Sequence, residues 1–231
     1  MLLFIDTEFT DLRKNAELIS IGVISERGDK FYAEITDYDK EKCNDFVLSV
    51  VIPRLICKNK IERKIEKCFN VYKGYGTKLE VGKAFKEFLT DMNAKKITFV
   101  SDVCHYDAVL IFDLLMYSSF GEIPDFINPM FIDISTFLFE DSVKCVLEAS
   151  KNRLNILTHE ELEFAETYAF DTNRESMLGI EAENNDIKHN AFWDAYCIME
   201  LFYSSNAGQK LMIDYRASEI SPQNIRDFLQ E

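Results

Sequence analysis

The sequence predicts an α/β protein built on a mixed five-stranded sheet, with the first three strands antiparallel and helices covering the faces. Two observations support this prediction. Short apolar runs that end in polar residues, such as residues 2–5, are typical of strands that are buried on both faces of a sheet. Later strands alternate with segments whose apolar residues recur at helical spacing, as expected for a sheet covered by helices.

The expected strands begin close to the N-terminus. The first is the run LLFI, and the second and third form a hairpin around the turn Arg27-Gly28-Asp29, because a glycine-containing turn between two apolar runs is a hairpin signal. The fourth and fifth strands follow helical segments and are expected to join the sheet afterwards. The five expected strands are residues 2–5, 17–26, 30–36, 96–100 and 130–134.

Helices are expected wherever apolar residues fall on one stripe. The clearest example is 190–204, where Ala191, Ala195, Ile198 and Phe202 share one face. Ser221-Pro222 supplies an N-cap and a first-turn proline for a last helix. The expected helices are residues 39–56, 79–92, 107–117, 190–204 and 222 to the C-terminus.

Two segments do not fit a simple strand or helix. The lysine-rich stretch 57–79 contains Gly74 and Gly76 and predicts a helix fragment followed by a loop. The stretch 135–186 predicts short helical pieces and an acidic region without a clear period. We therefore expect one domain over 1–231, with insertions at about 57–78 and 141–186.

Composition narrows the class of protein. Apolar residues make up 47% and charged residues 29% of the 231 positions, as in globular proteins. No run approaches the roughly 18 apolar residues that span a bilayer, and the N-terminus lacks the basic region of a signal peptide.

The six cysteines form no CxxC pair, which favours a reducing cytoplasm over a disulfide scaffold or zinc site. Cys104 and His105 are neighbours, and on an extended segment they would face opposite ways, which disfavours a nucleophile pair.

The charge is acidic and unevenly distributed. The net charge is −14, yet residues 54–78 hold eight Lys/Arg against two Glu, and residues 159–186 hold nine Asp/Glu against one Arg. Both runs are typical of solvated surface, and the basic run is also suited to following a phosphate backbone. The overall charge disfavours binding to a long duplex, which usually requires a basic face.

A pair of acids ends the first strand. Asp6 and Glu8 are two residues apart, so their side chains leave the same face of a strand. Two carboxylates about 4 Å apart repel by roughly 4 kcal/mol at an effective dielectric of about 20. A divalent cation bound between the two carboxylates replaces this repulsion with attraction. Hard oxygen ligands suit Mg²⁺ or Mn²⁺. Alone, the pair is better explained as solvated acids at a strand end.

A histidine and a further acid lie near the other end of the chain. His189 directly precedes the helix 190–204, and Asp194 falls in its first turn. This spacing can present an imidazole and a carboxylate to one cleft. An imidazole can accept a proton near neutral pH, as a general base requires.

A third element follows the fourth strand. Asp107 opens the helix after Tyr106, and Asp102 is its rival at the end of the same strand. An acid at a helix start is also a common capping residue, because carboxylates are favoured by the N-terminal dipole.

Taken together and in this order, DTEF at 6–9, YD at 106–107 and His189 with Asp194 resemble the three motifs of the DEDDh exonuclease superfamily. Its members include ribonuclease T, oligoribonuclease and proofreading exonuclease subunits, and their fold is ribonuclease H-like. The blocks DTEFTD, ELISIGVISERGDKFYAEITDYD and VIPRL are most similar to small bacterial and phage exoribonucleases such as ribonuclease AS, which prefers adenylate tails.

The resemblance implies a role for each motif residue. Asp6, Glu8 and Asp194 would hold one metal ion, Asp6 would bridge to a second, and Asp107 would support the second. His189 would take a proton from the attacking water, which places the chain in the subclass with histidine as general base. Asp107 is preferred to Asp102 because the family motif has an aromatic residue before the acid, as Tyr106 is here.

The resemblance also implies a substrate and partners. Phe9 and Leu18 match positions that flank the terminal base in relatives, beside Tyr106, although both also fit a core. The expected activity is 3'-5' hydrolysis of single-stranded RNA, releasing nucleoside 5'-monophosphates. A DNA exonuclease and a non-catalytic nucleic-acid-binding module are the alternatives. Small relatives are often homodimers, so a homodimer is expected here.

Overall fold

The computed structural model describes residues 1–57, 65–149, 157–170, 174–180, 187–205 and 222–230. A seven-stranded sheet with the order β4-β5-β3-β2-β1-β6-β7 forms its centre. The strands are β1 (Leu2–Phe9), β2 (Leu18–Ser25), β3 (Lys30–Ile35), β4 (Glu66–Cys68), β5 (Val71–Gly76), β6 (Thr98–Ser101) and β7 (Ile132–Asp133).

The strand directions confirm the predicted mixed sheet. β1 pairs antiparallel with β2, and β2 pairs antiparallel with β3. On its other side β1 pairs parallel with β6, which pairs parallel with β7. This α/β arrangement is compatible with a ribonuclease H-like fold.

The strand count of five is wrong, because β4 and β5 lie in the segment predicted to be a helix fragment and a loop. β5 pairs parallel with β3 and antiparallel with β4. Its buried positions alternate, and they are Tyr72, Gly74 and Gly76. Two of the three are glycines, which contribute no hydrophobic signal, so the period of two is hidden in the sequence. Residues 58–64 of this segment lie outside the described residues.

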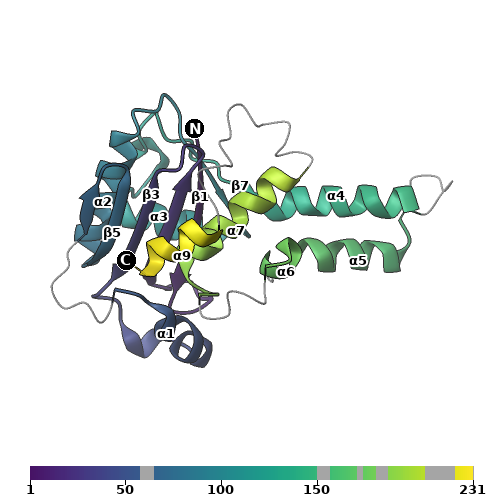
Figure 1. Cartoon of the computed structure of the whole chain (residues 1–231), viewed down its shortest axis with the longest axis horizontal. Helices are drawn as coiled ribbons and strands as arrows, with labels where there is room; N and C mark the ends of the chain where they lie inside the picture. Colours follow the sequence, from purple (N-terminus) through teal and green to yellow (C-terminus); the bar gives the residue numbers. More distant parts are fainter. Residues whose placement is uncertain (58–64, 150–156, 171–173, 181–186, 206–221, 231) are drawn as a thin grey trace.

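Helices cover both faces of the sheet (Figure 1). Alternate side chains of β1 enter different cores: Leu3 and Ile5 pack with the helices α2 and α3, whereas Phe4 packs with α7 and α9. These four helices are α2 (Lys78–Asp91), α3 (His105–Leu114), α7 (Ala191–Ser204) and α9 (Pro222–Gln230). They match the predicted helices, although Ser221, the predicted N-cap of the last one, lies outside the described residues.

The predicted helix 39–56 is replaced by shorter pieces. A 3-10 turn (Lys40–Lys42) is followed by a π-helical turn (Val47–Val51) and α1 (Ile52–Arg54). Val47 and Val51 are buried against Ile19 of β2. This packing holds the segment against the start of β2.

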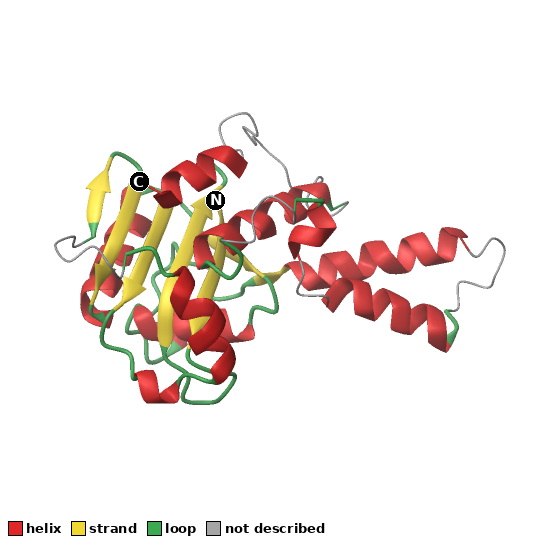
Figure 2. Ribbon diagram, turned by 60° about the horizontal axis from the view of Figure 1, so that its bottom comes forward, coloured by secondary structure: helices red, strands yellow, loops and turns green. Residues whose placement is uncertain are grey.

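Two longer helices form an arm that projects from the sheet (Figures 1 and 2). These are α4 (Ile134–Ala149) and α5 (His159–Phe170), where only short helical pieces were expected. The short helix α6 (Arg174–Leu178) follows α5 and contacts α7. Within the described part of the chain, no helix has the length and apolar character needed to cross a membrane.

Candidate active site

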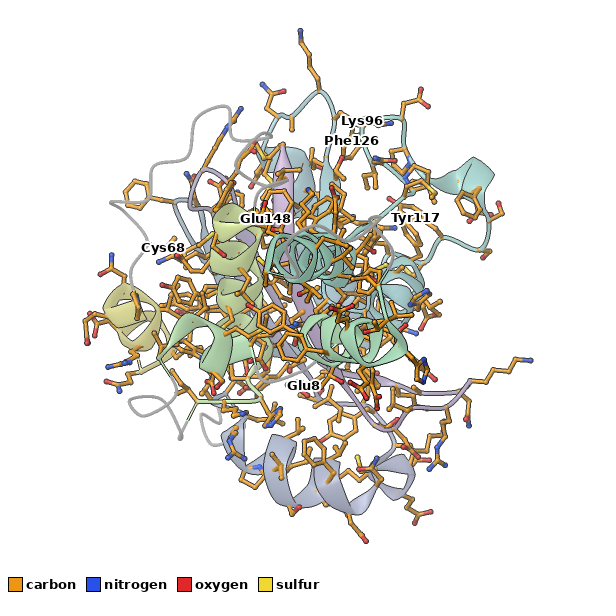
Figure 3. All side chains as sticks on the ribbon, turned by 90° about the vertical axis from the view of Figure 1, so that its right-hand side faces the viewer. Glu8, Cys68, Lys96, Tyr117, Phe126 and Glu148 are labelled. Atoms are coloured by element: carbon orange, nitrogen blue, oxygen red, sulfur yellow. The ribbon has the colours of Figure 1, made fainter. Side chains whose placement is uncertain are left out.

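The C-terminal half of β1 carries the first two predicted site residues. Asp6 and Glu8 alternate with Thr7, so the two carboxylates leave one face of the strand and the Thr7 hydroxyl leaves the other. Asp6 and Glu8 line a cavity of about 330 Å³. Figure 3 shows Glu8 toward the end of the sheet that faces the segment containing α1.

The start of α7 brings His189 and Asp194 to the same cavity. Asn190 caps the helix: its side-chain oxygen accepts a hydrogen bond from the Phe192 amide at 3.1 Å. Its amide nitrogen donates to the Tyr32 hydroxyl of β3 at 3.2 Å, which ties the cap to the sheet. Asp194 lies in the first turn, as predicted.

Gly22 of β2 allows this helix to approach the sheet. A Cβ atom at Gly22 would lie 2.3 Å from the Ala191 carbonyl carbon and 2.3 Å from the Phe192 Cα. Both atoms belong to the backbone, so they cannot move aside as a flexible side chain can. The absence of a side chain at this position therefore sets the depth at which α7 packs.

The predicted residues converge on one point. One potential ligand atom from each of Glu8, His189 and Asp194 lies within 4.8 Å of the other two. Asp6 lines the same cavity. The structure thus brings together four of the five residues on which the sequence prediction depends, although 181 residues separate Glu8 from His189.

The carboxylates repel one another at half-buried positions. Burial raises the pKa of Asp6 well above its ordinary value, and Asp194, Asp107 and Glu8 raise it further. The pKa of Glu8 is also raised well above its ordinary value, first by burial and then by the charge of Asp194. Burial and then Glu175 raise the pKa of Asp194 to about 8. This acid-lined, oxygen-rich cavity fits a hard divalent cation, whose charge would offset the repulsion.

His189 is held in an unusual backbone conformation. Its φ angle is 60°, in the left-handed region that non-glycine residues seldom adopt. Its ring meets the Phe46 ring edge to face, with centroids 5.2 Å apart. Burial, with Lys188 and Arg54 nearby, lowers the pKa of His189 below its ordinary value. The lowered pKa of His189 favours the neutral imidazole, which is able to accept a proton.

Asp107 lies on the opposite face of β1 from the carboxylates of Asp6 and Glu8. It accepts a hydrogen bond from the Thr7 hydroxyl at 2.5 Å and another from the Ser101 hydroxyl. Burial raises the pKa of Asp107 to about 6 although these hydroxyls lower it. Its charge acts on Asp6 and Glu8, but it is not among the residues that line the cavity. Its role as a metal ligand stays a prediction.

Asp102, the rival of Asp107, does line the cavity. However, both of its carboxylate oxygens accept hydrogen bonds from Arg174, each at 2.6 Å. Ser135 donates a third hydrogen bond, also at 2.6 Å. A carboxylate with these partners has less lone-pair capacity left for a metal ion. Asp107 also accepts a hydrogen bond on each oxygen, so the preference for Asp107 over Asp102 stays a prediction.

Three charged residues of the cavity wall were missed by the sequence interpretation. They are Arg174 and Glu175 of α6 and Lys188, which precedes His189. Glu175 accepts a hydrogen bond from the Trp193 indole at 2.5 Å and lies 3.7 Å from the Lys188 ammonium. Arg174 could have been noticed as the single basic residue between 159 and 186.

The predicted base-binding residues separate into two groups. Phe9 lines the cavity, and its ring stacks on Tyr106 at 5.1 Å with an interplanar angle of 8°. Leu18 is instead buried in the core between the sheet and α2 and α3, and it borders a different cavity beside Ile35 and Tyr38. The structure does not bring Leu18 to the candidate site, because β2 directs this side chain into the core.

Comparison with known proteins identifies partial relatives. The chain is 44% identical over 55 residues to a 3'-5' exoribonuclease of Mycobacterium tuberculosis strain H37Rv, and equally to a 3'-5' exoribonuclease of strain CDC 1551. The match covers 24% of this chain, and the chain spans about a third (33%) of the length of these curated relatives. No family model matches the chain.

Proposed function

We propose that this protein is a metal-dependent 3'-5' exonuclease of the DEDDh type that hydrolyses single-stranded RNA from the 3' end. The observation that carries the proposal is the convergence of Asp6, Glu8, His189 and Asp194 on one cavity from two ends of the chain. The partial relatives are 3'-5' exoribonucleases, which supports the same activity here.

The half-buried carboxylates are suited to hold the cofactor. Asp6, Glu8 and Asp194 would hold one Mg²⁺ or Mn²⁺ ion. Asp6 would bridge to a second, which Asp107 would support directly or through water. When bound, such a pair of ions supplies activation of water and stabilisation of charge on the phosphate. In this proposal Thr7 and Ser101 orient Asp107 through its two hydroxyl hydrogen bonds.

His189 acts as the general base. One of its ring nitrogens lies within 4.8 Å of carboxylate oxygens of Glu8 and Asp194 and takes a proton from the attacking water. A bond forms between the water oxygen and phosphorus, and the bond from phosphorus to the 3' oxygen breaks. The shortened strand leaves with a 3'-hydroxyl that gains a proton, and the product is a nucleoside 5'-monophosphate.

The cavity favours the end of a single strand. Its volume of about 330 Å³ is at the lower end of small-ligand sites and suits one terminal nucleotide. The aromatic pair of Phe9 and Tyr106 can offer a stacking surface for the base, worth about 1–3 kcal/mol. The net charge of −14 disfavours a long duplex.

Digestion of matched RNA and DNA oligonucleotides tests this function. Each would be 5'-labelled and incubated with Mg²⁺ or Mn²⁺. We expect RNA to shorten one nucleotide at a time with release of 5'-monophosphates, and DNA to shorten more slowly because it lacks the 2'-hydroxyl. Equal or faster loss of DNA would replace the RNA assignment with DNA exonuclease, and internal cleavage would contradict an exonuclease.

The oligomeric state needs a separate measurement. A homodimer stays a prediction, since it comes from the resemblance to small relatives. Mass measurement in solution at several protein concentrations should give twice the chain mass of 26.9 kDa. A mass equal to one chain at every concentration would contradict it.

A further inference from the structure

A second group of potential metal ligands lies outside the cavity. Cys104 and His105 begin α3, and Asp133 ends β7. One ligand atom from each of these three residues lies within 4.8 Å of the other two. The group combines a thiol, an imidazole and a carboxylate, whereas the candidate active site has carboxylates and one imidazole.

Asp133 is already oriented by the backbone. Its Oδ1 atom accepts hydrogen bonds from the amide of Ser135 at 2.9 Å and the amide of Val103 at 3.2 Å. Its Oδ2 atom makes no hydrogen bond within the described part of the chain. One oxygen therefore fixes the carboxylate and the other remains available, which is how outer contacts commonly orient a metal ligand.

The backbone beside the cysteine is strained. Val103 has a φ angle of 49°, and a β-branched residue in the left-handed region is a clear outlier. Strain of this kind tends to persist at ligand-binding sites, where the surrounding structure compensates for it. Val103 also lines the candidate active-site cavity, so it adjoins both groups of ligands. The strained residue directly precedes Cys104. The cysteine is a free thiol of intermediate exposure, and His105 is exposed, so an ion could reach the group from solvent.

We propose that Cys104, His105 and Asp133 bind one Zn²⁺ ion, with water as the fourth ligand. Zn²⁺ accepts sulfur, nitrogen and oxygen ligands in a tetrahedral arrangement, whereas Mg²⁺ prefers oxygen alone. The thiol loses its proton when the ion binds. The ion would join the end of β7 to the first turn of α3, two residues before Asp107.

Cobalt substitution distinguishes this site from the carboxylate cavity. Titration of the full chain with Co²⁺ should produce a near-ultraviolet absorption from thiolate-to-cobalt charge transfer that saturates at one equivalent. The proposed ligands of the carboxylate cavity include no thiolate, so binding there does not produce the band. Zn²⁺ added afterwards should abolish the band by displacing Co²⁺.

Two variants and one control complete the test. Cys104→Ser should remove the band, and Asp133→Asn should weaken Co²⁺ binding by more than about 100-fold, the upper end of the effect of losing an outer-shell contact. Cys145→Ser, which changes an exposed cysteine of α4, should leave the band unchanged. Circular dichroism would confirm that each variant folds. A parent protein without the band, or a band that survives Cys104→Ser, would overturn the proposal.

Discussion

Asp6 and Gly22 face each other across the antiparallel pair of β1 and β2. Side chains at opposite positions of such a pair lie on the same face of the sheet, so the face that carries the Asp6 carboxylate has no side chain at Gly22. The backbone of Ala191 and Phe192 occupies that space. The register of two strands thus determines how closely the start of α7, with Asp194, approaches Asp6.

Replacing Gly22 with alanine should damage both stability and activity. The new Cβ atom would meet backbone atoms of α7 at 2.3 Å, so the helix must move away from the sheet. We expect the free energy of unfolding to fall by about 1–3 kcal/mol, the usual effect of overpacking, and nuclease activity to fall with it. Urea unfolding and a rate assay would measure both.

Gly121→Ala is the matched control for this substitution. The nearest atom to a Cβ there is the Ser119 hydroxyl oxygen at 3.9 Å, an ordinary contact. We expect a change within about 0.5 kcal/mol, as for most surface substitutions. If Gly22→Ala were as stable as Gly121→Ala, the close approach of α7 would not depend on Gly22.

Neutralising one acid of the cavity should stabilise the metal-free protein while abolishing activity. Burial and like charges raise the pKa of Asp194 to about 8, so its ionised form is unfavourable in the folded state without a cation. Asp194→Asn removes that charge, and the melting temperature without metal should rise. Glu148→Gln at the exposed end of α4 should change neither property. A lower melting temperature for Asp194→Asn would show that the repulsion is unimportant.

The same repulsion predicts how stability changes with pH. The pKa of Asp194 rises from 3.8 to about 8 on folding and that of Asp107 rises to about 6. The folded state therefore binds these protons more tightly than the unfolded state. This contribution to stability is complete below about pH 4 and is lost as the pH rises through 6 to 8.

Thermal melts across this range test the pH prediction. Without metal, the contribution of these acids should make the melting temperature decrease between pH 5 and 8, with a smaller decrease in Asp194→Asn. Mg²⁺ or Mn²⁺ should raise the melting temperature more at pH 8 than at pH 5, because the cation binds the ionised carboxylates. An equal effect of the ions at both pH values would contradict a carboxylate metal site.

The sequence was sufficient to predict the fold class and to predict that four candidate site residues lie together, for a physical reason. Asp6 and Glu8 share a face because of the period of a strand, and Asp194 lies in a first turn because the apolar stripe after it defines a helix. These are local rules. The order of the three motifs along the chain then suggested that these distant elements meet. Asp6, Glu8, His189 and Asp194 do line one cavity.

The rest depends on contacts between segments that carry no local signal. β5 was missed because Gly74 and Gly76 occupy two of its three buried positions. The entry of Arg174 and Glu175 into the cavity wall depends on how α6 returns from the arm to α7. Leu18 was placed near the substrate by resemblance, but the direction of its side chain from β2 puts it in the core.

Arg174 should be required to keep the charge of Asp102 compensated. The two side chains form a bidentate pair, and only 7% of the Arg174 side chain and 14% of the Asp102 side chain are exposed. Arg174→Met leaves a buried carboxylate without its partner, so we expect a loss of about 3–5 kcal/mol in the free energy of unfolding. Adding Asp102→Asn should recover part of that loss.

An exposed ion pair provides the comparison for Arg174. Lys144 and Glu140 pair on the surface of α4, where such pairs contribute about 0–1 kcal/mol. Lys144→Met should therefore have a small effect, measured under the same denaturant conditions. If Arg174→Met were equally mild, or if Asp102→Asn gave no recovery in the double variant, the pairing would not be what holds α6 against the site.

The most direct test of the carboxylate centre is metal-dependent shortening of a 5'-labelled, single-stranded RNA by the parent protein and by Asp194→Asn. We expect the parent to remove single nucleotides from the 3' end with Mn²⁺ or Mg²⁺ and to stop when a chelator is added. Asp194→Asn should be at least about 100-fold slower, as for loss of a group that acts in the transition state, and Glu148→Gln should match the parent. Shortening that continues in the chelator, or that is as fast in Asp194→Asn as in the parent, would contradict the assignment of this cavity as the active site.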